Sequence, residues 1–193
     1  MIRFIHFVDD ISTWVGKAFS WAVVLLTIGV CYEVFMRYVL RQPTAWAYDA
    51  SYMLYGAMFI MAGAYALAHN AHVRGDVLFR FWPLRVQGAI ELTLYVIFFF
   101  PAVLGLIYAG YGFAKLAWMV NEHSSFSPAG PPLYHFKSLI PIAGVFLFIQ
   151  GIAEVCRCII CIRAGYWPPR EKEVADIVEI FAEEHHLRDG PER

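Results

Sequence analysis

Two oppositely charged side chains stand four residues apart at the end of the first long apolar segment. Glu33 and Arg37 have the spacing of a helical ion pair, with the acid on its favourable N-terminal side. After a short turn, Thr44 reads as a helix N-cap, Trp46 suits the aromatic belt of a membrane, and Asp49 lies where a helix end attracts negative charge. Ionisable groups are costly in hydrocarbon, so their placement at the mouths of apolar segments indicates a use. Interface anchoring and contact with a partner explain these residues equally well.

A second polar run follows the second apolar segment and contains His72, Arg74 and Asp76. Two histidines, His69 and His72, are spaced as metal or haem ligands often are. A haem inside a membrane bundle needs histidines within facing spans, whereas all seven histidines here fall in expected loops, ends or tails. The sequence therefore predicts neither haem nor a metal site.

Polar groups within the later apolar segments are few. Gln150 lies in the last segment, Glu91 and Glu154 lie near segment ends, and Glu154 can pair with Arg157 at i, i+3. An ion-coupled pathway needs broken helices and several polar groups near the membrane midplane. The chain also has no nucleotide loop, nucleophile constellation or zinc signature. We expect neither an enzyme nor a transporter acting alone, and no cofactor. The cysteine cluster, which matches no zinc pattern, reads as small apolar filler.

The amino-acid composition indicates that these residues belong to membrane-spanning segments. Of 193 residues, 60% are hydrophobic and only 16% are charged, and the mean hydropathy is +0.54. Soluble domains average roughly 25% charged residues, so the chain falls in the membrane class. A net charge of -1 without a basic patch argues against nucleic acid as a partner.

The apolar segments predict an all-α membrane protein with four transmembrane helices. They cover about residues 19–36, 46–68, 88–120 and 139–162. A span needs ~20 mostly apolar residues, so the third is too long for one straight crossing. We expect it to be one tilted or bent span, because it contains Pro101 and several glycines but no polar turn. These spans form a membrane domain over 18–163, and an uncleaved first span fits better than a signal peptide.

The distribution of basic residues predicts the topology. Of the 15 Lys and Arg residues, 11 lie on the side of the two termini and 4 on the other side. Basic residues favour the cytoplasm, so both termini are expected inside. Residues 1–17 are amphipathic and are expected to lie along the cytoplasmic interface, and the tail over 164–193 is expected to contain an amphipathic helix.

Three motifs taken in order resemble a known family. They are Glu33-x-x-x-Arg37-Tyr38, then Pro43-x-x-Trp46-x-x-Asp49, then His72-Val73-Arg74-x-Asp76. Their order and their placement against the spans closely resemble the small integral membrane (Q) subunit of tripartite ATP-independent periplasmic (TRAP) transporters, over roughly Val15–Ile162. The chain departs from the family pattern at Tyr48, where a second acid is frequent, and at Gly75, where a branched apolar residue is usual.

The resemblance implies a non-catalytic subunit in the bacterial inner membrane. Its partners would be a large permease subunit, which carries the substrate and sodium sites and moves as an elevator, and a soluble periplasmic substrate-binding protein. Glu33, Arg37, Tyr38, Trp46 and Asp49 would then serve the outer face, where the binding protein docks to deliver an organic acid or similar small solute. His72, Arg74 and Asp76 would order the inner loop.

Two other classes remain open on the sequence. One is a haem-bearing redox membrane anchor, which a haem spectrum would reveal. The other is a scaffold of an unrelated membrane complex, which the identity of its bound partners would reveal. Composition alone does not separate such a scaffold from a transporter subunit.

Overall fold

The computed structural model describes residues 1–70, 82–128, 130–168 and 170, which are helical apart from the loops between helices. Four helical segments are long and apolar enough to cross a membrane: Ile2–Tyr38, Ala47–Ala68, Leu84–Met119 and Tyr134–Ala164. They correspond to the four predicted spans. His72, Arg74, Asp76 and most of the predicted tail helix lie outside the described residues.

The first segment consists of α1 (Ile2–Ser20) and α2 (Ala22–Tyr38), joined at Trp21. The apolar residues of α1 do not form one face: Ile5 and Val8 are buried, whereas Phe7 and Trp14 are 63% and 73% exposed. The buried stripe of α1 also includes polar residues. This helix packs against α3 (Ala47–Ala68) and α7 (Tyr134–Ala164), and its predicted position along the cytoplasmic interface stays a prediction.

The long third segment is one bent helical unit, as its length and proline content predict. It runs through α5 (Leu84–Leu94), the π-helical turn η1 (Tyr95–Phe99) and α6 (Phe100–Met119). The π-turn ends two residues before Pro101, which has no backbone N–H and would crowd the preceding turn of a regular helix. On the facing helix, a Cβ added to Gly151 would lie 2.4 Å from the Phe99 ring, so a glycine is needed where the bent segment packs closest.

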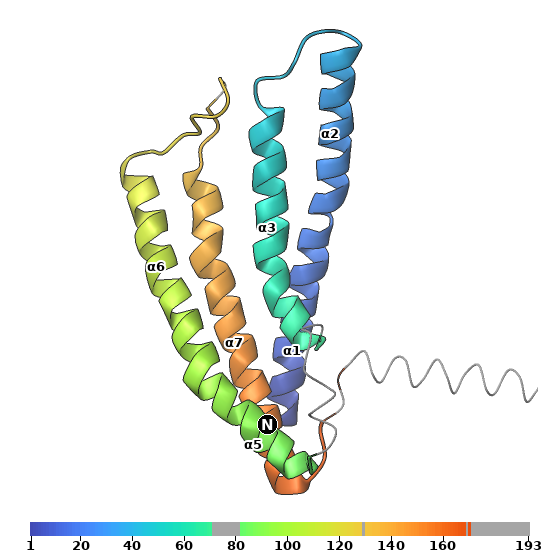
Figure 1. Ribbon diagram of the computed structural model, residues 1–193, viewed down its shortest axis with the longest axis vertical. Coiled ribbons are helices and arrows are strands. Elements are labelled where there is room, and N and C mark those ends of the chain that lie inside the picture. Colours follow the sequence, from blue (N-terminus) through green and yellow to red (C-terminus); the bar gives the residue numbers. More distant parts are fainter. Residues whose placement is uncertain (71–81, 129, 169, 171–193) are drawn as a thin grey trace, which may run out of the picture.

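The helices form an open layer, not a closed bundle. Helix α6 packs on α7, α7 on α3, and α3 on α2, which gives the order α6, α7, α3, α2 seen in Figure 1. Helix α1 packs on α3 and α7, where an apolar cluster of Val15, Met61 and Ala143 lies at its centre. In the first apolar segment, no residue of the most apolar stretch is buried. In the fourth segment, 39% of the corresponding stretch is buried.

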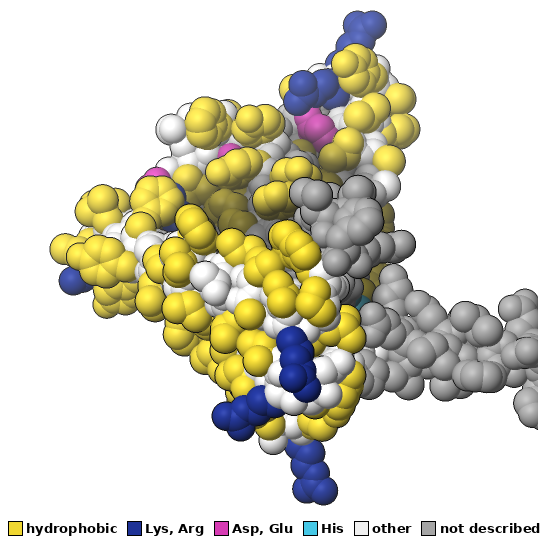
Figure 2. Space-filling view, turned by 60° about the horizontal axis from the view of Figure 1, so that its bottom comes forward, with side chains coloured by type: hydrophobic (Ala, Val, Ile, Leu, Met, Phe, Trp, Pro, Cys, Tyr) yellow, Lys and Arg dark blue, Asp and Glu magenta, His cyan; other side chains and the backbone are white. Residues whose placement is uncertain are grey.

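Small residues recur seven positions apart in each span, but only some of them mediate packing. A Cβ at Gly144 would lie 2.7 Å from Ile107, whereas a Cβ at Gly29, Gly105 or Gly112 would meet nothing within 4 Å. Hydrophobic side chains cover most of the face seen in Figure 2, and Lys and Arg lie toward its edges. The edge helices therefore present apolar surface to lipid or to another subunit.

Candidate partner interface and buried polar network

We call the end with residues 39–46 and 120–133 the upper end of the layer, and the end with the chain N-terminus the lower end (Figure 1). The predicted ion pair lies at the upper end. Arg37 donates to Glu33 Oε1 from Nη2 at 2.6 Å and from Nε at 3.0 Å. The i, i+4 pairing expected from the sequence is confirmed.

Glu33 also fastens the connection between α2 and α3. Its second carboxylate oxygen accepts hydrogen bonds from the backbone N–H of Thr44, at 3.0 Å, and from the Thr44 hydroxyl. The prediction that Thr44 caps the next helix is wrong, because α3 begins at Ala47 with Trp46 at its N-cap and no side-chain cap. Thr44 lies three residues before Ala47, outside the first turn of α3, and its hydroxyl donates to Glu33.

The aromatic residues of this motif lie around the same connection. Trp46 stacks on Tyr32 with ring centroids 6.3 Å apart, which joins the start of α3 to α2. Tyr38 is 75% exposed at the end of α2. With Glu33 and Arg37 it lines a hollow of about 270 Å³ between α2 and α3. We call this arrangement of residues around Glu33 and Thr44 the clasp, because it joins α2 to α3. It brings together Glu33, Arg37, Tyr38 and Trp46, which are four of the five residues predicted to serve the outer face.

Asp49 belongs to a different cluster. Its side chain is 1% exposed in the first turn of α3, as predicted, and accepts a hydrogen bond of 2.8 Å from the Ser124 hydroxyl. Its second oxygen makes no hydrogen bond to any described residue. The sequence did not identify Ser124, because 75 positions separate the two residues.

Ser124 holds a tight loop between α6 and α7. Its hydroxyl also accepts a hydrogen bond from the Phe126 N–H, and its own N–H donates to Pro131 O at 3.0 Å. Glu122 closes the base of this loop through Lys137, at 2.5 Å. The Phe126 ring is 80% exposed at the tip and lies 6.3 Å, centroid to centroid, from Tyr48. A fixed loop thus presents an aromatic pair at the upper end.

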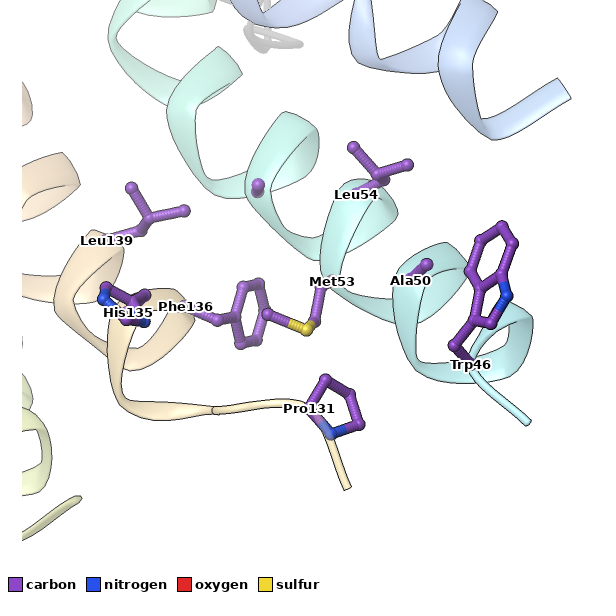
Figure 3. Close-up of a pocket in the computed structure, with 9 residues that line it drawn as sticks. Trp46, Ala50, Met53, Leu54, Pro131, His135, Phe136 and Leu139 are labelled. Atoms are coloured by element: carbon purple, nitrogen blue, oxygen red, sulfur yellow. The ribbon is translucent and has the colours of Figure 1, made fainter. Parts of the chain in front are cut away.

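An apolar groove of about 660 Å³ lies beside this loop between α3 and α7 (Figure 3). Trp46, Ala50 and Met53 line it from α3, and His135 and Phe136 line it from α7. The Phe136 ring lies over Gly56, where an added Cβ would be 2.5 Å from the ring. The groove is open and lined almost entirely by hydrocarbon, so it suits an apolar chain or side chain rather than a polar solute.

The lower end holds a buried polar network that joins three helices. Gln150 of α7 accepts from Ser12 and donates to Asp9 Oδ1, each at 2.8 Å, while Arg157 donates to Asp9 Oδ2. Arg157 also lies near Glu154, with 3.7 Å between Nε and Oε1, which confirms the pairing expected at i, i+3. All five side chains are at most 6% exposed.

Arg170, from the segment after α7, completes the network. It donates to Glu154 Oε1 at 3.1 Å and to Oε2 at 2.8 Å. It also donates to the carbonyls of Leu67 and Ala68 at the end of α3, where Leu67 O accepts from the Asn70 N–H as well. The sequence pointed to Gln150, Glu154 and Arg157 but not to Asp9, whose partners lie more than 140 positions away.

The cysteines make no metal site in the described part of the chain, where no group of three His, Cys, Asp or Glu side chains is arranged to hold an ion. Cys158 and Cys161 are fully buried, as filler residues would be. Each also makes a weak hydrogen bond: Cys158 Sγ is 3.8 Å from Glu91 Oε2, and Cys161 Sγ is 3.3 Å from Leu84 O.

The amino-acid sequence matches a known family over most of its length. The model of the DctQ component of the tripartite ATP-independent periplasmic transporters matches residues 26–160, more than two thirds of the chain. The chain belongs to this family. No curated protein matches it. A DctQ component is the small membrane subunit of a TRAP transporter, so this chain is a multi-pass membrane protein that works with other transporter subunits.

The family match covers both clusters of the upper end, and it covers Gln150, Glu154 and Arg157 of the lower network. Asp9, Ser12 and Arg170 lie outside the matched residues. The two ends of this DctQ component therefore differ: the upper clasp lies within the family region, whereas the lower network is completed by residues from both flanks.

Proposed function

We propose that this chain braces a large elevator-type permease subunit and helps a periplasmic binding protein dock, in a sodium-driven transporter that imports an organic acid or similar small solute. The open layer of helices carries this proposal. The first and third apolar segments have 0% and 11% of their most apolar stretches buried. The row of α6, α7, α3 and α2 leaves the apolar sides of its outer helices largely uncovered, so it suits a part that lies along a larger membrane subunit.

The distribution of polar groups supports a bracing role. The described charged groups lie toward the two ends, and each cluster bonds mainly to itself: Glu33 to Arg37 and Thr44 above, Asp9 to Arg157 below. The neutral amide of Gln150 extends the lower cluster to the middle of α7. Between them the core contains Val15, Met61 and related apolar residues. Ion-coupled pathways are built from polar groups near the midplane, so the transport sites are assigned to the large subunit.

The upper end suits the docking of a soluble protein. Its loop is held by Ser124 and Glu122, so the exposed Phe126 and Tyr48 rings need little ordering on contact. Pre-ordered aromatic residues are frequent binding hot spots. Arg37 is also available to a partner, because its side chain is 54% exposed despite its bond to Glu33.

The proposed orientation places both termini in the cytoplasm of the bacterium and the upper end in the periplasm, because most basic residues lie on the side of the termini. His72, Arg74 and Asp76 would then order the inner loop. Single-cysteine labelling with an impermeant maleimide in a cysteine-free variant tests this orientation: a cysteine at Phe126 should react in spheroplasts, and one at Arg3 only after lysis.

Arg37→Ala tests the docking role. We expect solute uptake to fall several-fold while the chain stays in the membrane and retains the large subunit. Arg41→Ala, which removes the same charge from an exposed neighbour, is the matched control. Equal uptake by the two variants would exclude Arg37 from docking. Failure of the wild-type chain to co-purify with a large permease subunit from its native host would refute the bracing role itself.

A further inference from the structure

The lower network contains four buried charges whose signs balance. Asp9 and Glu154 are the acids, and Arg157 and Arg170 are the bases. Asp9 belongs to α1, Glu154 and Arg157 belong to α7, and Arg170 follows α7. Removing one charge from such a set leaves its partner buried without compensation, which is far more costly than removing a whole pair.

Arg157 lies between the two acids and is bonded fully to only one of them. It donates to Asp9 from Nη2, while its Nε is 3.7 Å from Glu154 Oε1, beyond hydrogen-bond distance. Nε and Nη1 make no hydrogen bond to any described residue, although the side chain is 1% exposed. Arg157 therefore has unused donors beside Glu154.

Glu154 does not need those donors while Arg170 is in place, because Arg170 occupies both of its oxygens in a forked arrangement. Arg170 reaches the site from a segment that turns away from α7 at Gly165, whose φ of 78° lies in the left-handed region. The same guanidinium binds the last carbonyls of α3. The Arg170 side chain thus ties the segment after α7 to both α7 and α3.

We propose that Arg157 is a shared counter-ion that couples the latch formed by Arg170 to the seating of α1. When Arg170 leaves, Glu154 becomes an unpaired buried acid, and Arg157 turns its free donors to it. The two acids then compete for the single positive charge of Arg157, so its bond from Nη2 to Asp9 weakens and the N-terminal half of α1 loosens from α7. Detachment of the C-terminal segment is in this way transmitted to the N-terminal helix. The inference does not depend on the proposed function.

Hydrogen exchange measured by mass spectrometry tests the coupling. The full-length chain is purified from native host membranes in mild detergent with the proteins it retains there. Arg170→Gln is compared with Arg163→Gln, which removes the same charge from an exposed residue near the end of α7. We expect Arg170→Gln to speed exchange in the peptide around Asp9 by about 5- to 150-fold, the usual range of site-to-site coupling. Arg163→Gln should leave it unchanged.

The double variant Glu154→Gln with Arg170→Gln separates charge transfer from general loosening. With Glu154 neutral, Arg157 has no reason to leave Asp9, so exchange around Asp9 should return to within about twofold of wild type although the latch stays open. Persistent fast exchange in the double variant would overturn the proposal. So would an Arg170→Gln variant in which only the ends of α3 and α7 exchange faster.

Arg170→Lys covers the case in which Arg170→Gln does not fold. Lysine keeps the positive charge but offers no planar fork for both Glu154 oxygens and the α3 carbonyls. We expect the end of α3 to exchange faster and the region of Asp9 to stay protected. Faster exchange at Asp9 in this variant would show that the bonds of Arg170, not the charge balance, hold α1, and would overturn the proposal.

Discussion

Ser124→Ala should destabilise the chain, because it removes the hydrogen bond that Ser124 donates to the buried side chain of Asp49. The Ser124 hydroxyl donates to Asp49 Oδ1 at 2.8 Å, and Asp49 is 1% exposed. Its other oxygen has no hydrogen-bond partner among the described residues. The substitution therefore leaves a buried carboxylate with neither oxygen bonded to a side chain, at a helix start that favours negative charge only in part.

The magnitude follows from the charge on the acceptor. Neutral hydrogen bonds between membrane helices contribute about 0.6 kcal/mol on average, because the unfolded chain finds other partners in the membrane. Hydrogen bonds to charged groups contribute about 1.5–3 kcal/mol, and a buried acceptor left unsatisfied costs a similar amount. The acceptor Asp49 is both buried and acidic, so we expect Ser124→Ala to lower the free energy of unfolding by about 2 kcal/mol.

Reversible unfolding in mixed micelles of dodecyl maltoside and sodium dodecyl sulfate, followed by circular dichroism, gives the free energy. Ser125→Ala is the matched control, because Ser125 is the exposed neighbour in the same loop. Combining Ser124→Ala with Asp49→Ala should show a coupling energy of about 1.5 kcal/mol or more, since each residue acts through the other. A Ser124→Ala variant within about 0.5 kcal/mol of Ser125→Ala would refute the reasoning.

Three further substitutions test other parts of the structure. Gly151→Ala should destabilise by about 1–3 kcal/mol in the same unfolding assay, because its Cβ would overlap a ring of the π-turn, whereas Gly105→Ala has open space and should be neutral or stabilising. Asp9→Asn should lower the free energy of unfolding by about 3 kcal/mol, because it breaks a buried ion pair with Arg157. The control Asp10→Asn changes an exposed side chain and should lower it by less than about 0.5 kcal/mol. Equal losses in the two variants would contradict the buried network. Phe126→Ala should leave stability unchanged but weaken binding-protein affinity at least about tenfold, as surface plasmon resonance on the reconstituted complex would measure; unchanged affinity would exclude Phe126 from docking.

Local features of the fold could be predicted from the sequence. The span Ala47–Ala68 begins within one residue of the expected start, because apolar length alone defines a membrane helix. The pairs Glu33–Arg37 and Glu154–Arg157 follow from helical periodicity. The bend before Pro101 follows from the chemistry of proline.

The contacts that depend on tertiary structure could not be predicted in this way. Asp9 looked like part of a polar helix face, and only the packing of α1 on α7 brings it to Arg157. Thr44 had a local explanation as an N-cap, but α3 begins only at Ala47, and the partner of Thr44 is Glu33 in the preceding helix. Small residues stand seven positions apart in every span, yet only packing decides which of them are in contact, and a Cβ at Gly29 or Gly112 would meet nothing within 4 Å.

The two ends of the layer suggest different roles because they are fastened differently. At the lower end, one charge-balanced network crosses α1, α3 and α7 and includes Arg170, so these helices are held as one unit. At the upper end, the clasp around Glu33 and the loop around Ser124 are separate, and an open apolar groove lies between α3 and α7. Deformation of the layer on docking is therefore expected at the upper end. In the proposed role, the lower end would resist motion, and the helix ends around the groove would shift on docking more than the loop that Ser124 holds.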